Sequence, residues 1–456
     1  MNKPQLRLPI GAFPEPVAEP AIWRPIHYLG SKLRLVEPLR LALDQVDPAR
    51  GPVCDLFSGS GTVSAALAAS RNVISVDIQE YSRVLCSAVL KPAGISDSEA
   101  REFIQRAGGK GHAAGLSAAA PLIEYEERCL DKARKGQYEP ICELIEHAAI
   151  VAFHRADRPS VQPPLEKAHQ HTLRLLDANA AKMLMLRHFG GLYFSYQQAV
   201  ELDSLLIAAH EEKEHVRDSL LAAIISTASE IVNTVGKHFA QPIRPRGSDG
   251  MPKRHLIAKI LRDRDLAIGP LFSTWLNRYR SLPKTGCKHQ AIRADYVDAL
   301  TNLDRKLGVV YADPPYTRDH YSRFYHVLET MCLWDDPGVS MTRIRTETET
   351  FSRGMYRAER HQSPFCIKSQ APVAFERLFA AVRDLQVPLV LSYSPYASDS
   401  NAHPRVMTVE QITRSAQKYF SRVETVSAGR ISHMKLNATR LHIDASAEAE
   451  LIFLCT

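Results

Sequence analysis

Short apolar runs of strand length alternate with helically spaced stretches toward both ends of this 456-residue chain. The apolar runs lie at 52–57, 72–76, 291–294, 308–312 and 387–393. Helical spacing of apolar residues follows or separates them at 62–69, 81–90 and 374–383. This alternation predicts an α/β domain with a doubly wound, Rossmann-like parallel sheet. Two later runs, 422–426 and 450–455, are predicted to be antiparallel strands that close the sheet.

The middle of the chain has a different pattern. Residues 98–235 contain long helical patterns rich in Ala, Leu and Glu, for example 202–215 and 217–235, and residues 240–293 are rich in Pro and Arg. We therefore predict that a large, mainly helical insertion over 98–289 interrupts the sheet, which divides the α/β domain into residues 26–97 and 290–456. Six prolines in residues 1–25 predict an extended N-terminal arm.

Composition narrows the class of protein without naming a function. Apolar content of 45% and charged content of 23% are ordinary for a soluble globular protein, and the net charge of +7 is compatible with a polyanionic partner. No apolar run approaches 18 residues and no signal peptide is visible, so we expect no membrane span and a cytoplasmic location. The eight cysteines form no CxxC pair and no zinc-like spacing, so reduced thiols and no metal site are expected.

The tetrapeptide Asp313-Pro314-Pro315-Tyr316 directly follows the apolar run 308–312. Two prolines fix φ and remove two backbone donors, so the turn after the strand is stiff. Asp313 and the carbonyl group of Pro314 can accept both hydrogens of an exocyclic amine, and Tyr316 can stack on the ring that carries it. The motif therefore indicates a site for methyl transfer to an amino group. A proline-rich turn with no catalytic role could have the same four residues.

A second motif runs from Asp55 through Phe57 to Gly59 and Gly61, at the end of the run 52–57. Glycines at these positions let the backbone turn tightly and approach a ligand. Asp77 ends the next predicted strand, where an acidic residue typically accepts hydrogen bonds from ribose hydroxyls. Such a loop could serve a dinucleotide or another nucleotide. Lys32, in the segment 28–32, could pair with a carboxylate, which S-adenosylmethionine has and NAD lacks.

With its elements in this order, the chain resembles the N6-adenine DNA methyltransferases of the alpha motif order, the DNA adenine methylase type. That family has a Tyr/Trp-x-Gly-x-Lys element, a glycine loop, a strand-end Asp, a target-recognition insertion and then Asp-Pro-Pro-Tyr. The resemblance covers about 28–90 and 290–400 and implies that the insertion recognises DNA. It also implies the acid–aromatic pair Asp295-Tyr296 as a contact of the cofactor adenine. By resemblance, S-adenosylmethionine is bound by Tyr28, Lys32, Asp55, Phe57, Gly59, Gly61, Asp77, Asp295, Tyr296 and Asp313, and catalysis uses Asp313, Pro314, Pro315 and Tyr316.

The expected substrate of such an enzyme is double-stranded DNA, from which the target base must be flipped out. Residues 240–293 contain twelve Lys and Arg against three Asp and Glu, which favours phosphate binding. Within that segment Arg244, Arg246, Lys253 and Arg254 are the candidates for DNA contact. The family also suggests cognate restriction or defence proteins as partners.

Several alternatives stay open at this point. The same four residues could methylate RNA, or N4 of cytosine. A catalytically silent DNA-binding subunit of a defence complex would keep the helical insertion but would be free to lose Asp313. A cytosine-C5 methyltransferase is excluded because the chain contains no Pro-Cys dipeptide, and a dehydrogenase would leave Asp313–Tyr316 and Lys32 unexplained.

Overall fold

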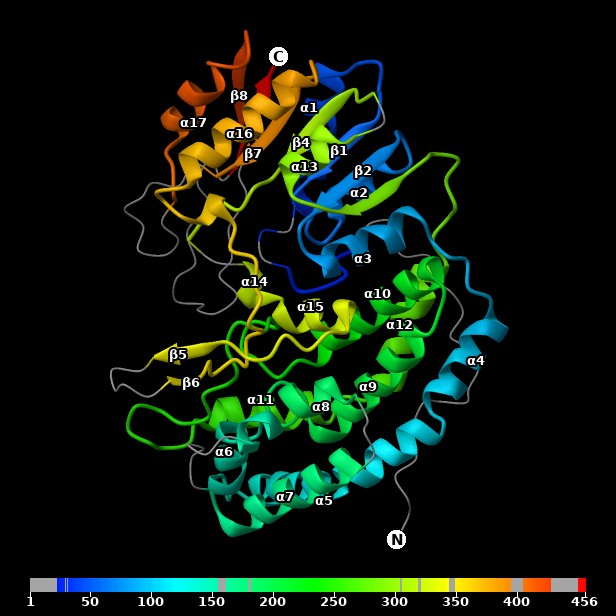
Figure 1. Ribbon diagram of the computed structural model, residues 1–456, viewed down its shortest axis with the longest axis vertical. Coiled ribbons are helices and arrows are strands. Elements are labelled where there is room, and N and C mark those ends of the chain that lie inside the picture. The colour runs from blue at the N-terminus through cyan, green and yellow to red at the C-terminus, as the bar shows by residue number, and fades with distance from the viewer. Residues whose placement is uncertain are drawn as a thin grey trace. The chain divides into compact units, whose positions relative to one another are not determined.

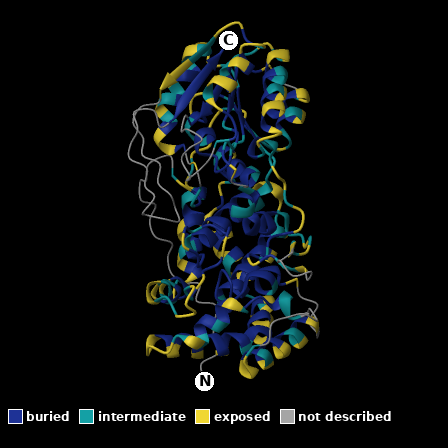
Figure 2. Ribbon diagram, turned by 90° about the vertical axis from the view of Figure 1, so that its left-hand side faces the viewer, coloured by how far each residue is buried: buried dark blue, intermediate teal, exposed yellow. Residues whose placement is uncertain are grey.

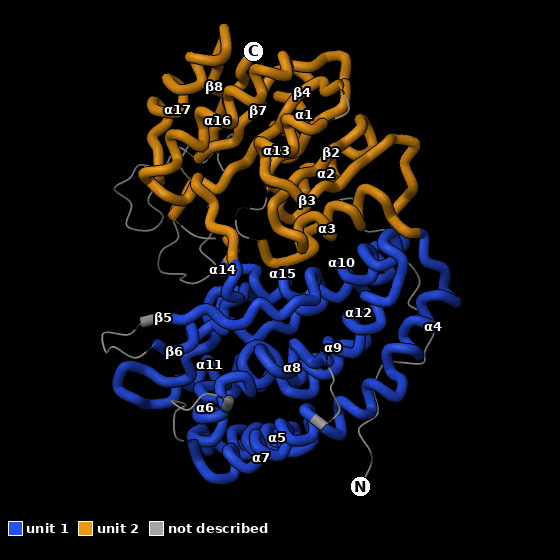
Figure 3. Tube along the Cα trace, in the orientation of Figure 1, with its two compact units in different colours: residues 1–16, 94–281, 323–359 blue, residues 17–93, 282–322, 360–456 orange. Residues whose placement is uncertain are grey.

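The computed structural model describes residues 23–28, 30, 32–154, 161–178, 182–303, 306–318, 321–343, 349–394, 405–427 and 450–456. The arm predicted over 1–25 lies almost entirely outside the described residues. The described chain falls into compact units, each assembled from segments that are distant in sequence (Figure 3). Unit 1 takes in residues 94–281 and 323–359, and unit 2 takes in 17–93, 282–322 and 360–456 where these are described.

Unit 2 is built on a sheet that contains seven strands among the described residues, in the order β3-β2-β1-β4-β7-β9-β8 (Figure 1). The strands are β1 (Val53–Leu56), β2 (Val73–Asp77), β3 (Gln290–Arg293), β4 (Val309–Ala312), β7 (Leu389–Tyr393), β8 (Val423–Ser427) and β9 (Leu451–Cys455). The first five strands in that order pair in parallel, and β9 runs antiparallel to both of its neighbours. The mostly parallel sheet and its antiparallel closure confirm the sequence prediction.

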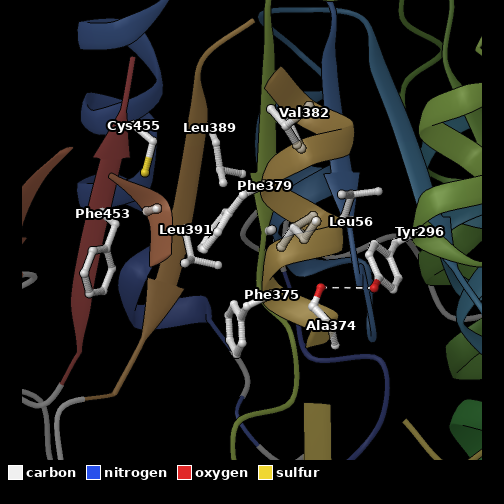
Figure 4. Close-up of a cluster of buried hydrophobic side chains, with 14 of the residues drawn as sticks. Leu56, Tyr296, Ala374, Phe375, Phe379, Val382, Leu389, Leu391, Phe453 and Cys455 are labelled. Atoms are coloured by element: carbon white, nitrogen blue, oxygen red, sulfur yellow. Dashed lines mark hydrogen bonds between the residues drawn. The ribbon is translucent and has the colours of Figure 1, made fainter. Parts of the chain in front are cut away.

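Helices cover both faces of this sheet because successive strand residues point to opposite sides. Cys54 and Leu56 face a core shared with α13 (Tyr296–Thr301), α16 (Ala371–Asp384) and α17 (Val409–Ala416). Val53 faces a core shared with α1 (Val36–Val46), α2 (Thr62–Leu67) and α3 (Glu80–Leu90). Figure 4 shows the first of these cores, with Phe375 and Phe379 of α16 packed against the strands. A short 3-10 helix, η1 (Leu33–Leu35), leads into α1. Strands β1, β4, β7 and β9 are buried throughout, whereas exposed residues gather on the outer helical turns (Figure 2).

The strand order reverses between β1 and β4, which are adjacent and in register, with Leu56 opposite Ala312. The loop after β1 and the Asp313 turn after β4 therefore leave the sheet side by side. In open α/β sheets, ligands bind at such a switch point, outside the carboxyl ends of the strands.

Unit 1 is mainly helical. Its helices are α4 (Asp97–Ala107), α5 (Lys110–Arg134), α6 (Glu139–Glu146), α7 (Pro163–Ala178), α8 (Leu184–Phe189), α9 (Tyr196–His210), α10 (Glu214–Ile231), α11 (Arg254–Arg264), α12 (Ile268–Arg280) and α15 (His326–Leu333), with a 3-10 turn η2 (Ile150–His154). Helices α9 and α10 are buried on nearly all sides, because α5, α8 and α12 pack around them.

Two predicted helix bounds in this unit are wrong. The stretch 202–215 is not one helix, because α9 ends at His210 and α10 begins at Glu214. The polar run between them offers no buried face and forms a turn, in which the amide of Glu212 donates to the carbonyl of Ala209. The stretch 217–235 stops at Ile231, since the amide of Asn233 donates to the carbonyl of Tyr193 instead of continuing the helix.

Residues 323–359 group with the helical unit, whereas the predicted division places them in the second part of the α/β domain. The reason is that α15 packs against α10. This segment also holds a short antiparallel hairpin of β5 (Met341–Arg343) and β6 (Glu349–Phe351). Helix α14 (Tyr321–Phe324) precedes α15, and a 3-10 turn, η3 (Pro364–Cys366), follows the hairpin within unit 2. None of the described helices combines the length and the apolar character that crossing a bilayer requires.

Candidate active site

A pocket lies at the carboxyl edge of the parallel strands of unit 2. Its walls are formed by the segments that follow β1, β2, β3 and β4, together with residues 361–366. Most of the residues predicted from the sequence meet there. They are Tyr28, Lys32, Phe57, Asp77, Asp295, Tyr296, Asp313, Pro314, Pro315 and Tyr316. Asp55, Gly59 and Gly61 do not line it.

Asp313 extends from the end of β4 and forms an ion pair with Lys32, whose Nζ lies 3.0 Å from Oδ1. The same ammonium group lies 3.1 Å from Oε1 of Glu450. Burial raises the pKa of Asp313 to about 6, with Lys32 acting downward and Glu450 upward. Burial alone would lower the pKa of Lys32, but the two carboxylates outweigh it and hold that pKa well above its ordinary value. Lys32 is therefore charged, and Asp313 is mostly ionised at neutral pH.

Tyr316 presents an aromatic ring beside this ion pair. Its ring meets that of Tyr393 edge-on, with centroids 5.2 Å apart. The guanidinium carbon of Arg405 lies 4.7 Å from the Tyr316 centroid and the ammonium of Lys32 lies 5.6 Å from it. Cations near a ring are attracted by its quadrupole, so these contacts hold the ring in place. Burial raises the pKa of Tyr316 well above its ordinary value, so the phenol stays protonated.

Asp77 ends β2 and organises the glycine loop. Its carboxylate accepts hydrogen bonds from the amide of Gly59 at 3.0 Å and the amide of Gln79 at 2.9 Å. Burial raises the pKa of Asp77, although these two hydrogen bonds oppose that shift. A carboxylate has about four lone-pair directions, so acceptor capacity remains for a ligand in the pocket. Gly59 has φ of +54°, and a Cβ there would lie 2.5 Å from the hydroxyl of Tyr28.

Asp55 and Gly61 stabilise the glycine loop after β1 and do not line the pocket. Asp55 is 1% exposed and accepts a hydrogen bond of 2.5 Å from the hydroxyl of Ser64 in α2. Burial raises its pKa to about 7. Gly61 has φ of +75° at the N-cap of α2, where an added Cβ would lie 3.1 Å from the sulfur of Cys86. Both residues shape the loop that carries Phe57.

The acid–aromatic pair after β3 also reaches the pocket. Asp295 caps α13 by accepting from the amide of Val297 at 2.9 Å. The hydroxyl of Tyr296 donates to the carbonyl of Ala374 at 3.1 Å (Figure 4). The Tyr296 ring packs against Phe57 and Phe365, with centroids 5.5 and 5.3 Å away. Together these mutually inclined rings make an apolar wall beside the carboxylate of Asp295.

Several pocket residues escaped sequence reasoning. His361 and the turn 363–366 come from a stretch that has no motif, and burial lowers the pKa of His361. Ser322 lines the pocket while 6% exposed, and its hydroxyl has no hydrogen-bond partner among the described residues. Glu450, which also has no motif, does not line the pocket but lies 3.1 Å from the ammonium group of Lys32, which does. A buried hydroxyl without a partner costs free energy, which fits a pocket that holds a polar ligand.

The four candidates for DNA contact belong to unit 1 and differ in their surroundings. Arg244 and Arg254 are exposed, and Lys253 is half-buried. Arg246 is engaged within the protein, with Nη1 2.6 Å from Glu139 and Nε 3.2 Å from Glu146. The charge of Arg246 is therefore already balanced by two carboxylates.

Comparison with known proteins gives consistent findings. The family model described as D12 class N6 adenine-specific DNA methyltransferase matches residues 28–111 and 276–368. A modification methylase, LlaI from Lactococcus lactis subsp. lactis, is 36% identical over 86 residues, which are 19% of this chain and 12% of that protein. The type II methyltransferase M.NlaIII from Neisseria lactamica is 23% identical over 390 residues, 81% of this chain and 83% of that protein. Both matched segments of the family model include pocket residues.

Proposed function

Since two segments of the chain match the D12 class of N6 adenine-specific DNA methyltransferases, we propose that the chain uses this pocket to transfer a methyl group from S-adenosylmethionine to N6 of an adenine at specific sites in duplex DNA. The observation that carries the proposal is the position of Asp313. Its carboxylate stands at the end of β4 in the same pocket as Asp77, which ends β2, and Asp295, which follows β3.

Asp313 is the residue we assign to the target amine. The lone pair of an adenine amino group is delocalised into the ring, so the nitrogen is a poor nucleophile. A carboxylate that accepts one N–H of the amine, together with the carbonyl of Pro314 accepting the other, would draw the lone pair out of conjugation. Positioning and electrostatics of this kind supply most of the acceleration in such a site. The ionised form of Asp313 is required, so the rate should rise with pH through about 6.

Tyr316 is assigned to the flipped-out base. A base inside a duplex cannot reach a pocket at the edge of a sheet, so the target must leave the stack. An aromatic ring provides a surface on which an extruded base can stack, and Tyr316 is fixed by Tyr393 and Arg405.

The other end of the pocket fits the methyl donor. S-adenosylmethionine supplies a methyl group on a sulfonium centre. We assign Asp77 to hydrogen-bond ribose hydroxyls, and Asp295 with the Tyr296 wall to hold the adenine. We assign the ammonium group of Lys32, which forms ion pairs with Asp313 and Glu450, to pair with the carboxylate of the methyl donor as well. Tyr28, which overlies Gly59, borders the same end.

Unit 1 is proposed to read the target sequence and to bind the phosphate backbone. Its exposed Arg244 and Arg254, with Lys253, would supply part of the positive charge. A cognate restriction nuclease is a proposed partner, because the relatives named above are a modification methylase and a type II methyltransferase.

The test is transfer of labelled methyl from S-adenosylmethionine to unmethylated duplex DNA, followed by nucleoside analysis. We expect label in N6-methyladenine, lost in Asp313→Asn, a variant of the same size. The control is Asp384→Asn, an exposed aspartate on α16, which should transfer normally. Label in RNA alone or in N4-methylcytosine would change the substrate, and no label in any nucleic acid would overturn the proposal.

A further inference from the structure

One ammonium group in unit 2 pairs with two carboxylates, of which Glu450 is buried and Asp313 is partly exposed. Lys32 lies 3.0 Å from Asp313 and 3.1 Å from Glu450, and the three side chains are 7%, 19% and 2% exposed. One carboxylate would suffice to neutralise a lysine. The second gives the trio one acidic group more than the ammonium group needs, at a site with little exposed surface, where removing charge from water costs free energy.

The topology explains how Glu450 reaches this point. It directly precedes β9, the strand that runs antiparallel to β7, with Leu451 opposite Tyr393. A reversed strand starts where its parallel neighbours end. The residue before β9 therefore lies at the carboxyl edge of the sheet, beside the turn that holds Asp313 and Tyr316.

Other groups that interact electrostatically with Asp313 cannot substitute for Glu450. Among the described residues these groups are Lys32, Glu450, Asp55, Tyr311 and Tyr316, with Arg405 behind Tyr316. The two tyrosines are neutral because burial raises their pKa values. The carboxylate of Asp55 accepts a hydrogen bond from the hydroxyl of Ser64. Glu450 is thus the acidic side chain that shares a cation with Asp313.

Resting on the function proposed above, we propose that Glu450 is a positioning residue for methyl transfer. By binding the ammonium group of Lys32, it divides that positive charge and keeps the Asp313 carboxylate a strong hydrogen-bond acceptor for the amino group of the target base. Lys32 holds Asp313 in place, and Glu450 prevents Lys32 from neutralising it. The upward effect of Glu450 on the pKa of Asp313 agrees with this division of charge.

The decisive variant is Glu450→Gln, which keeps the size of the side chain and removes its charge. Without that neighbour, Asp313 binds its proton less tightly. The acidic limb of the single-turnover rate against pH should move down by about one pH unit, the size that one close charge imposes. The plateau rate should fall by up to about tenfold, since a weaker base is a weaker acceptor. The KM for DNA should stay the same.

The matched control is Glu201→Gln, a buried glutamate in unit 1 that is hydrogen-bonded to Gln197 at 2.9 Å. It should leave the acidic limb where it is. A purely structural role for Glu450 would lower the rate at every pH without moving the limb. A limb that stays in place or moves to higher pH in Glu450→Gln would overturn the proposal.

A second measurement does not depend on activity. Carboxyl-labelled aspartates can be titrated by carbon NMR in the wild type and in Glu450→Gln, with Asp313→Asn identifying the Asp313 signal. A lower Asp313 pKa in Glu450→Gln supports the link, and an unchanged or higher value refutes it. If the wild type methylates no nucleic acid, the proposed function fails, while this titration still decides whether Glu450 controls the charge of Asp313.

Discussion

Both units contain aspartates that lie partly or fully inside the protein, but the surroundings of these aspartates differ between the units. In unit 1, Asp203 is fully buried and accepts hydrogen bonds from the amides of Met185 and Leu186, both at 2.9 Å, where α8 begins. Asp263 is likewise surrounded by Asn233, Lys237 and Lys259. In unit 2, Asp77 and Asp313 are only partly buried, and each lines a pocket.

The difference teaches that a perturbed carboxyl group does not by itself mark an active site. Burial raises the pKa of Asp203 to about 8, which is further than the shift to about 6 at Asp313. Asp203 has its acceptors directed at backbone amides of its own unit, so it stabilises a helix start. What distinguishes Asp313 is the adjoining space, bordered by an aromatic ring and by other acids.

The strongest test of the difference between Asp313 and Asp203 is the variant Asp313→Asn. The amide cannot accept hydrogen bonds as a carboxylate does, so single-turnover methyl transfer should fall by about 10³ or more. Binding of S-adenosylmethionine and the melting temperature should change little. A variant that retains more than about a tenth of the rate would mean that Asp313 belongs with Asp203 as a structural acid.

The reciprocal change is Asp203→Ala. Two buried amides at the start of α8 lose their acceptor, so the free energy of unfolding should fall by roughly 2–4 kcal/mol. Denaturant unfolding measures the loss. Asp384→Ala is the exposed counterpart and should stay within about 0.5 kcal/mol of the wild type. Equal stability of the two variants would contradict the structural assignment of Asp203.

A smaller effect is expected from Gly59→Ala. An alanine at φ of +54° is strained by about 1–2 kcal/mol, and its Cβ would push Tyr28 out of place. We expect binding of S-adenosylmethionine, measured by calorimetry, to weaken about tenfold, equivalent to about 1.4 kcal/mol. Gly250→Ala isolates the backbone strain, because Gly250 has φ of +77° and no atom within 4 Å of the added Cβ. If both variants bind the donor equally well, Tyr28 does not shape the site.

The smallest effect concerns unit 1. Replacing Arg244, Lys253 and Arg254 by Gln should reduce the salt dependence of DNA binding by about one unit of slope for each phosphate group that the variant no longer binds. Fluorescence anisotropy at several salt concentrations measures this slope. Arg246→Gln is the control, because Glu139 and Glu146 already balance that charge. An equal slope for the wild type and the triple variant would place the DNA-binding surface elsewhere.

The sequence predicted the sheet well because its strands are short apolar runs that end in recognisable residues. Asp77 and Asp313 stand where parallel strands stop, so their convergence follows from topology. Glu450 could not be predicted in the same way, since its role depends on the register of β9 against β7 and on a partner 418 positions earlier in the chain. Ser322 and His361 come from stretches with no periodicity or motif, and only their placement around the pocket reveals them.

The helical unit was harder for a related reason. Periodicity identified helices but not their ends, because His210 and Ile231 are followed by turns that tertiary hydrogen bonds define. Arg246 shows the same limit for charge. A run of basic residues indicates phosphate binding, yet only the structure reveals that Arg246 of this run forms ion pairs with Glu139 and Glu146.

The interleaving of strands has a consequence for synthesis of the protein on the ribosome. Strand β1 pairs with β2 nearby in sequence, but its other neighbour, β4, begins at Val309. While residues 94–281 are being made, the β1 edge has no partner, and exposed strand edges invite aggregation. Pairing over such a separation is intrinsically slow. The helices of unit 1 can fold in that interval, so we expect nascent chains halted before residue 309 to need chaperones more than completed ones.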